Sequence, residues 1–231
     1  MEKLKSLIET AHQLRAPGGC PWDAEQTHRS LVQYLLEETH ELIDALENGT
    51  REEVMEELGD VLYQVIFHSD LAAAGTLGAP FDLEDVAQFM EQKMRSRHPH
   101  VFGTAEELER FAAENGEDVM RNWEGHKKKE KPGRKSILDG IPQTMPALAL
   151  SSKVMGKAET AGILPGLSEP AISMESEEEL GQLLLAVVAS ARSAGLDPER
   201  ALREATRELQ AEIRALELQD DFDAGVVGFG N

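Results

Sequence analysis

The sequence is poor in cysteine and contains no long apolar run. Its one cysteine, Cys20, among 231 residues can form neither an intrachain disulfide nor a cysteine-based zinc site, so we expect a protein of the reducing cytoplasm. No stretch reaches the roughly 20 apolar residues that a membrane-spanning helix needs. Residues 1–15 have the pattern of an amphipathic helix and lack the apolar centre of a signal peptide. We therefore expect neither secretion nor a membrane partner.

Basic residues are scarce: 23 lysines and arginines face 43 aspartates and glutamates, for a net charge of −20. Proteins bind nucleic-acid polymers through basic surfaces that displace counterions, so no nucleic-acid polymer is expected as a partner. Small phosphorylated ligands are compatible with the charge, because divalent cations can join acidic side chains to phosphate groups. The simplest alternative is that the charge only keeps the protein soluble.

Strand patterns are also missing, and aromatic residues make up only 5% of the chain. Apolar residues instead recur at the helical spacing of three and four, which predicts an all-α fold. The predicted helices cover about residues 3–15, 30–47, 51–74, 83–96, 137–161, 176–193 and 197–218. Residues 18–28 and 162–174 are predicted to be loops, and the basic, proline-containing segment 127–134 is predicted to be a hinge.

Two of the predicted helices form a hairpin around Asn48, Gly49 and Thr50. Gly49 can adopt the left-handed conformation that commonly follows a helix end, so we expect it to stop the first helix. Thr50 and Glu53 have the spacing of a capping box, in which each side chain binds a free backbone amide. The short turn predicts two antiparallel helices that lie side by side.

Four carboxylates are placed symmetrically on these two helices. Glu41 lies eight residues before Gly49, and Glu57 lies eight residues after it. Glu38 lies eleven residues before the same glycine, and Asp60 lies eleven residues after it. At 1.5 Å per residue, the inner pair lies roughly 12 Å from the turn and the outer pair roughly 16 Å, so we expect all four to converge.

Converging carboxylates repel one another, and apolar neighbours such as Leu42 and Leu58 strengthen the repulsion. A cation would relieve it, and a set of carboxylate oxygens suits Mg²⁺ or Mn²⁺ better than zinc. A solvated acidic helix face is the alternative. A di-iron site would need a second Glu-x-x-His pair besides the one from Glu37 to His40, and the next helix has none. Walker A and dinucleotide-binding glycine motifs are absent from the sequence.

The acidic residues resemble the EExxE and ExxD signature of the MazG nucleoside triphosphate pyrophosphohydrolases. The signature reads Glu37-Glu38-x-x-Glu41 and Glu57-x-x-Asp60 in this chain. Further segments that resemble the family are Gly19-Cys20-Pro21-Trp22-Asp23 with Gln26-Thr27, Arg97-His98-Pro99-His100-Val101-Phe102, Asn122-Trp123-Glu124, and Leu138-Asp139-Gly140-Ile141-Pro142. The resemblance is strong over residues 5–155 and weak over the rest.

The resemblance implies a helical bundle in which the hairpin is completed by a partner subunit, as in a homodimer. It implies Mg²⁺-dependent hydrolysis of a nucleoside triphosphate to a monophosphate and pyrophosphate, with Mn²⁺ as a substitute metal. The family's metal ligands carry over onto Glu38, Glu41, Glu57 and Asp60, and Glu37 and Glu38 are the catalytic candidates. We expect Glu37 to orient the attacking water. A house-cleaning role, the removal of aberrant or excess nucleotides, is also inferred from the family.

The triphosphate tail needs cations, and Lys93, Arg95 and Arg97 are the substrate-binding candidates. They follow one another at the end of the predicted helix 83–96, and Arg97 belongs to a family-like segment. Ordinary surface ion pairing is the alternative for all three. Trp22 is a further substrate-binding candidate, either stacking on a base or anchoring its loop in the core.

A second, degenerate copy of the domain is predicted in the C-terminal half. Residues 56–62, EELGDVL, are echoed by residues 178–184, EELGQLL, and each is followed by a small-residue turn and an aspartate that starts a helix. Gln182 stands where the first copy has Asp60, and no EExxE helix precedes it. We predict a MazG-like catalytic domain at 1–105, a connecting helix and hinge at 106–150, the degenerate copy at 151–218 and a disordered tail at 219–231.

The alternative function is a non-enzymatic helical module that senses nucleotides or interacts with a protein through its degenerate half. Such a module would bind nucleotides without hydrolysing them. The complete set of carboxylates disfavours this alternative, because a scaffold gains nothing from their mutual repulsion.

Overall fold

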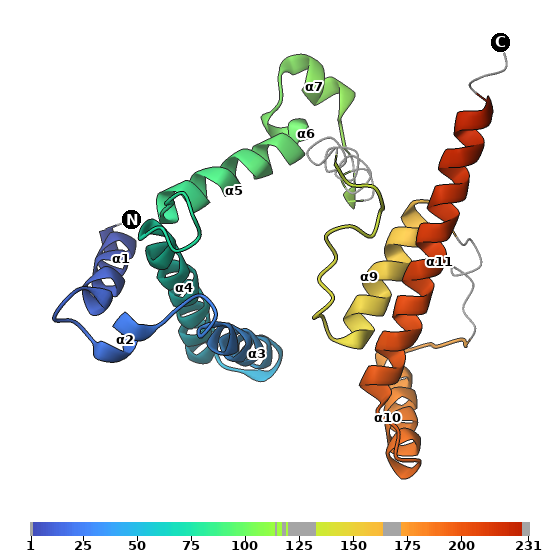
Figure 1. Ribbon diagram of the computed structural model, residues 1–231, viewed down its shortest axis with the longest axis horizontal. Coiled ribbons are helices and arrows are strands. Elements are labelled where there is room, and N and C mark those ends of the chain that lie inside the picture. Colours follow the sequence, from blue (N-terminus) through green and yellow to red (C-terminus); the bar gives the residue numbers. More distant parts are fainter. Residues whose placement is uncertain (1, 114, 117–118, 120–132, 164–171, 228–231) are drawn as a thin grey trace. The chain divides into compact units, whose positions relative to one another are not determined.

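The computed structural model describes residues 2–113, 115–116, 119, 133–163 and 172–227, and every regular element within these ranges is a helix. The all-α prediction is confirmed. The helices shown in Figure 1 are α1 (Glu2–Arg15), α2 (Pro21–Glu25), α3 (Val32–Asn48), α4 (Arg51–Ala73), α5 (Leu83–Arg97), α6 (Pro99–Phe102), α7 (Ala105–Arg110), α9 (Ala147–Thr160), α10 (Glu177–Ser193) and α11 (Pro198–Val227). The chain divides into two compact units, 1–127 and 128–231. None of the described helices is long and apolar enough to cross a membrane.

The segment between α1 and α3 is partly helical, although its sequence predicted a loop. Residues 21–25 form the short helix α2, and Pro21 occupies its first position. Proline suits this position because the amide proton that it lacks would have no partner in the first turn of a helix. The prediction of an irregular segment was wrong here because a single helical turn is too short to show periodicity.

Two helix ends in the C-terminal unit also differ from prediction. α9 begins at Ala147 after Pro146, and not near residue 137. α11 continues to Val227, past the predicted end near Leu218 and into the segment predicted to be a disordered tail. Residues 228–231 and 120–132 lie outside the described part of the chain, and the latter include the segment 122–124 and most of the predicted hinge. The division between the units falls within the predicted connecting segment 106–150, while the individual domain boundaries stay predictions.

The N-terminal unit is built on the antiparallel hairpin of α3 and α4 (Figure 1). α1 and α5 pack against α4, and α2 packs against α1. A small core forms where Leu31, Phe67 and Leu71 meet the partly buried rings of Tyr34 and Tyr63. These residues belong to the beginning of α3 and the end of α4, so the core lies at the open end of the hairpin, away from its turn.

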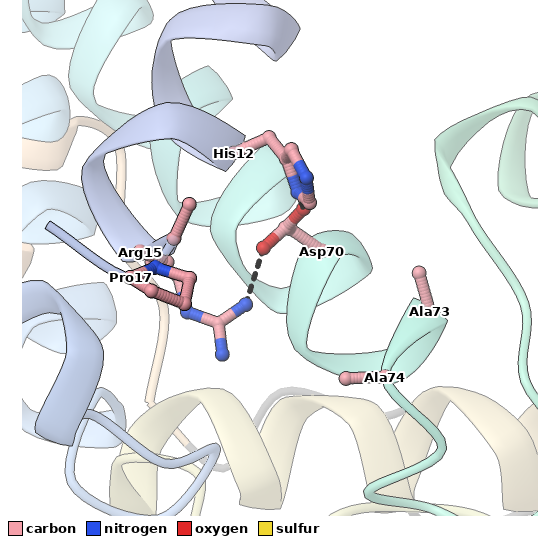
Figure 2. A pocket seen from close by; sticks show the side chains of 7 residues that line it. His12, Arg15, Pro17, Asp70, Ala73 and Ala74 are labelled. Carbon is pink, nitrogen blue, oxygen red and sulfur yellow. Dashed lines mark hydrogen bonds and ion pairs between the residues drawn. The ribbon is translucent and has the colours of Figure 1, made fainter. Parts of the chain in front are cut away.

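Ionic contacts attach α1 to α4 (Figure 2). His12 Nδ1 lies 2.7 Å from Asp70 Oδ1, and the guanidinium group of Arg15 pairs with the other oxygen of Asp70. The same guanidinium lies over the Phe67 ring, 5.5 Å from its centroid, which adds a cation–π attraction. Because the side chains of Arg15 and Asp70 are largely shielded from solvent, each charge depends on the other.

The turn between α3 and α4 needs glycine at residue 49, but for a different reason from the predicted one. Gly49 has φ −88° and ψ 175°, an extended and not a left-handed conformation. A Cβ atom at this position would lie 2.7 Å from the carbonyl oxygen of Ala45, too close for real atoms. Thr50 then starts α4 with the predicted capping box, in which Glu53 N donates to Thr50 Oγ1 and Thr50 N donates to the Glu53 carboxylate.

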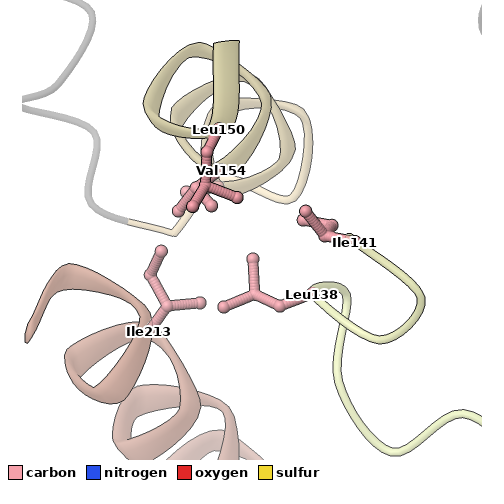
Figure 3. Close-up of a cluster of buried hydrophobic side chains, with 6 residues drawn as sticks. Leu138, Ile141, Leu150, Val154 and Ile213 are labelled. Atoms are coloured by element: carbon pink, nitrogen blue, oxygen red, sulfur yellow. The ribbon is translucent and has the colours of Figure 1, made fainter. Parts of the chain in front are cut away.

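The C-terminal unit has an apolar core of its own, shown in Figure 3. Leu150 and Val154 of α9 face Ile213 of α11, and Leu138 and Ile141 from the segment before α9 complete the cluster. α10 packs against α11, yet no residue of α10 itself is buried within the described chain. The helix that echoes α4 in sequence therefore lies outside the core of its unit.

Replacing Gly49 with alanine is expected to lower the free energy of unfolding by about 1–3 kcal/mol, because the added methyl group collides with the α3 backbone. The matched variant Gly59→Ala adds the same group to α4, where no atom lies within 4 Å. It is expected to raise the free energy of unfolding by about 1 kcal/mol, since alanine favours helix. Urea unfolding followed by far-ultraviolet circular dichroism measures both, and an undisturbed Gly49→Ala protein would contradict the steric explanation.

Candidate metal centre

The hairpin brings three of the predicted metal ligands together. Glu38 and Glu41 lie one turn apart on α3, and Glu57 approaches them from α4. One carboxylate oxygen of each residue lies within 4.8 Å of the other two. Divalent cations bind oxygen at about 2.0–2.6 Å, so a small inward movement of these side chains lets one ion contact all three.

Asp60 lies beside this cluster and not within it. It is absent from the group of oxygens within 4.8 Å, yet its charge is the strongest neighbouring influence on the pKa of Glu38. Three residues along a helix advance by about 4.5 Å, so Asp60 and Glu57 occupy successive levels of α4. The structure thus places the fourth predicted ligand next to Glu38, one level farther from the turn than Glu57.

Burial and mutual repulsion raise the pKa values of two carboxyl groups in the cluster. Burial is the largest cause for Glu38, followed by the charges of Asp60 and Glu41. Burial is again the largest cause for Glu57, followed by the charges of Glu41 and Asp60. Both groups are therefore harder to ionise than ordinary glutamates, and a nearby positive charge would reverse this effect.

One oxygen atom of Glu57 is buried without a hydrogen bond from the described residues. The side chain as a whole is partly exposed, but Oε2 is shielded from solvent and accepts no hydrogen bond from any described residue. A shielded carboxylate oxygen without a partner destabilises the fold. Since carboxylate oxygens are the ligands that Mg²⁺ and Mn²⁺ prefer, the residues present fit such an ion.

Glu37 lies at the exposed edge of the cluster. Its charge is the weakest of the acidic influences on the pKa of Glu38. Successive residues of a helix point about 100° apart, so Glu37 does not face the cluster in the way that Glu38 does. Its predicted role in orienting water stays a prediction.

The structure does not place the three predicted phosphate-binding cations within the glutamate cluster. Lys93, Arg95 and Arg97 lie in the last part of α5, which leads from α4 to α6 and α7 (Figure 1). Arg95 Nε donates to Glu91 Oε1 at 2.9 Å, and its guanidinium lies 4.9 Å from the centroid of the Phe102 ring. Arg97 is almost fully buried. The Phe102 contact joins α5 to α6, and the pair with Glu91 is the surface ion pairing expected as the alternative for Arg95.

Trp22 remains half exposed on α2, with 48% of its surface accessible. Its ring meets Tyr34 of α3 edge to face, with the centroids 5.5 Å apart. The buried residue of this segment is instead Asp23, whose carboxylate accepts a hydrogen bond from the Tyr63 hydroxyl at 3.5 Å. Trp22 thus contacts a residue that packs against the core while half of its own surface stays accessible, and both its anchoring role and stacking on a substrate stay predictions.

Two polar features farther along α4 were not predicted from the sequence. Gln64, one turn after Asp60, is buried, and its Oε1 has no hydrogen-bond partner among the described residues. His28 and His68 stack at a centroid distance of 5.0 Å, with their Nδ1 atoms 2.8 Å apart. The spacing of four between Asp60, Gln64 and His68 was the available signal, because it places all three on one side of α4.

Without metal, Glu38→Gln is expected to raise the melting temperature near neutral pH, because one charge leaves the cluster. A carboxyl group whose pKa is raised by folding destabilises the folded state above that pKa, and this effect vanishes as the pH falls to the ordinary value of 4.5. The difference between variant and wild type should therefore shrink as the pH approaches 4.5. Thermal unfolding in EDTA measures it, with MgCl₂ expected to stabilise the wild type more than the variant. Equal melting temperatures throughout would contradict the repulsion.

Known proteins resemble this chain in sequence, both in the hairpin and over most of its length. A family model described as the MazG nucleotide pyrophosphohydrolase domain matches residues 26–102, which contain α3, α4 and α5. An uncharacterized 26.1 kDa protein of Streptomyces cacaoi is 40% identical over 215 residues, which cover 93% of this chain and 83% of that protein. The Thermotoga maritima nucleoside triphosphate pyrophosphohydrolase/pyrophosphatase MazG is 36% identical over 231 residues, covering 94% of this chain and 85% of its own. The Escherichia coli K12 nucleoside triphosphate pyrophosphohydrolase is 32% identical over 240 residues, covering 94% and 88%. The chain belongs to the MazG family of nucleotide pyrophosphohydrolases.

Proposed function

We propose that this chain hydrolyses nucleoside triphosphates to a nucleoside monophosphate and pyrophosphate, with Mg²⁺ as the metal and Mn²⁺ as a substitute. The observation that supports this most directly is the cluster of Glu38, Glu41 and Glu57, in which Glu57 Oε2 is shielded and unpartnered among the described residues. Two relatives named nucleoside triphosphate pyrophosphohydrolases match it over 94% of its length.

In the proposed reaction, the clustered carboxylates hold the ion, and Glu37 at the exposed edge acts on the water. Glu38, Glu41 and Glu57 would hold the ion, with Asp60 as a further ligand beside Glu38. Magnesium, when bound, supplies positive charge that neutralises the triphosphate and makes nearby water more acidic. Water attacks the α-phosphorus, the bond from this phosphorus to the bridging oxygen breaks, and pyrophosphate leaves. Glu37, at the exposed edge, orients the water and accepts its proton.

Lys93, Arg95 and Arg97 are proposed to bind the triphosphate tail, and Trp22 to stack on the substrate. For this role Arg95 has to exchange Glu91 for a phosphate oxygen. Exposed ion pairs contribute little stability, so the exchange costs little. The half-exposed ring of Trp22 is available for stacking without a change in the core.

A homodimer is proposed because the hairpin leaves an apolar face uncovered. Large apolar side chains along both α3 and α4 are exposed in the single chain, a pattern typical of a protein interface. They are Val32, Leu36, Ile43, Leu46, Met55, Leu58, Leu62 and Val65. A second hairpin packed against this face would form a four-helix bundle, in which the apolar side chains are shielded from water.

The C-terminal copy is proposed to have a structural role and no catalytic one. Glu179 corresponds to Glu57 in the echoed sequence, but its Oε2 accepts a hydrogen bond from Glu175 N at 3.0 Å, next to the start of α10. Gln182 replaces the carboxylate of Asp60, so too few anions remain for Mg²⁺.

For the whole chain we propose house-cleaning of aberrant or excess nucleotides in the cytoplasm, where a lone cysteine stays reduced.

Glu57→Gln is expected to lower the rate of pyrophosphate release by about 100-fold or more, because a charge at the reaction centre is lost. The matched variant Glu179→Gln is expected to keep the wild-type rate. An enzyme-coupled pyrophosphate assay with several nucleoside triphosphates, with and without Mg²⁺, measures both. Full activity of Glu57→Gln would refute the site, and nucleotide binding without turnover by the wild type would favour the non-enzymatic module.

The double variant Leu36→Glu, Leu62→Glu is expected to convert a dimer into a monomer, because it places charges within the proposed interface. Leu108→Glu, on α7 and outside the hairpin, is the control, since Leu108 is 40% exposed and Leu62 39% exposed. Sedimentation velocity measures the masses. A wild-type monomer, or a dimer that persists in the double variant, would sink the proposed arrangement.

A further inference from the structure

A pocket lies on the hairpin beside the glutamate cluster. It is a half-open, almost entirely apolar pocket of about 350 Å³. Its walls include Leu35 of α3, Gln64 and His68 of α4, Leu77 and Phe81 of the following loop, and Val86 of α5. The pocket is large enough for a planar heterocycle, and its walls suit the faces of such a ring.

The register of the hairpin places this pocket next to the carboxylates. Leu35 lies three residues before Glu38 on α3, and Gln64 lies four residues after Asp60 on α4. Residues at these spacings share a helix face. Since the helices are antiparallel, Leu35 and Gln64 occupy one level, about 5 Å farther from the turn than Glu38 and Asp60. A ligand whose phosphates reach the carboxylates can therefore place its other end in the pocket.

Gln64 is the polar group that an apolar pocket does not explain. The side chain is only 7% exposed, and its Oε1 has no hydrogen-bond partner among the described residues. Burying an amide oxygen without a hydrogen bond costs free energy, and a ligand in the pocket that pairs with Gln64 would recover this cost. An amide can donate one hydrogen bond and accept another from the same planar edge.

The hydrogen bonds of His28 and His68 determine whether His68 Nε2 is a donor or an acceptor. The Thr76 hydroxyl donates to Leu71 O at 2.7 Å, so His28 Nε2, 3.0 Å from that hydroxyl, has to be the donor. Neutral His28 then accepts at Nδ1, and the proton in the 2.8 Å contact with His68 Nδ1 belongs to His68. His68 Nε2 is left as an acceptor to which no described residue donates.

We propose that this pocket binds the base of the nucleoside triphosphate and that Gln64 and His68 select the base. The inference rests on the proposed function and adds to it the place where the nucleoside is recognised. The apolar walls receive the faces of the ring, while Gln64 and His68 meet an edge that presents a donor beside an acceptor, as base edges do. Trp22 is not among the residues that line the pocket, so this place for the base and stacking of the base on Trp22 are alternatives, and we assign the base to the pocket.

Gln64→Leu, which keeps the apolar volume and removes the amide, tests this assignment. It is expected to lower kcat/KM for the preferred nucleoside triphosphate by about 10-fold and to narrow the differences between bases. Hydrolysis of ribose 5-triphosphate, which has the sugar and phosphates but no base, is expected to change less than twofold. An equal loss with both substrates means a merely structural role, and unchanged base preference means no recognition; either result overturns the inference.

Leu77→Trp gives a second test that does not disturb a buried position, because Leu77 is 60% exposed. The larger ring is expected to fill the mouth of the pocket and raise KM for nucleoside triphosphates several-fold, with ribose 5-triphosphate unaffected. Leu196→Trp is the matched control, at a leucine that is 62% exposed in the other unit. Unchanged KM in Leu77→Trp, or an equal rise in the control, would overturn the inference.

A readout independent of turnover separates this inference from the proposed function. The side-chain amide signals of Gln64, assigned by their loss in Gln64→Leu, are expected to shift in ¹H–¹⁵N spectra when a nucleoside triphosphate is added, and to stay in place with inorganic tripolyphosphate. If no triphosphate is hydrolysed but these signals shift, the proposed function is wrong and the pocket stands. If hydrolysis occurs and the signals do not respond to the nucleotide, the pocket assignment is wrong and the proposed function stands.

Discussion

Three carboxylates within 4.8 Å of one another repel, and the α3–α4 hairpin has to hold them there. Burial, followed by this repulsion, raises the pKa values of Glu38 and Glu57, and Glu57 Oε2 has no hydrogen-bond partner among the described residues. The capped turn at Thr50 and the aromatic core at the opposite end both resist the separation of the helices. A bound cation would turn the same repulsion into attraction, so occupancy of the site and stability of the hairpin are coupled.

The two units place similar acidic sequences in different surroundings. In the N-terminal unit the carboxylates of α4 face those of α3, and a metal is the partner that fits them. In the C-terminal unit Glu179 binds a backbone amide at the start of α10, so its charge is already satisfied by local structure. No residue of α10 is buried, whereas the second half of α4 forms much of its unit's core. The acidic sequences of α4 and α10 are therefore similar, but their surroundings in the fold differ.

Most of the helices and the level of the glutamate cluster could be predicted from the sequence, because they depend on periodicity and on contacts between near neighbours. The Thr50 capping box and the approach of Glu57 to Glu41 are of this kind. The pair of His28 and His68 joins residues 40 apart, and no local pattern indicates it. The spacing of four places Gln64 on the side of α4 that carries Asp60, but its burial depends on the packing of α3, α4, α5 and the intervening loop, which no local pattern shows.

The segment that marks the family, residues 26–102, does not include α1. Asp70 lies inside that segment, but the side chains that pair with it, His12 and Arg15, belong to α1. A fragment that begins at residue 26 would lose these contacts and the cation–π contact of Arg15 with the Phe67 ring, so we expect it to be less stable than the complete unit. The segment that the family model matches is thus shorter than the packed N-terminal unit, because α1 and α2 both lie before residue 26.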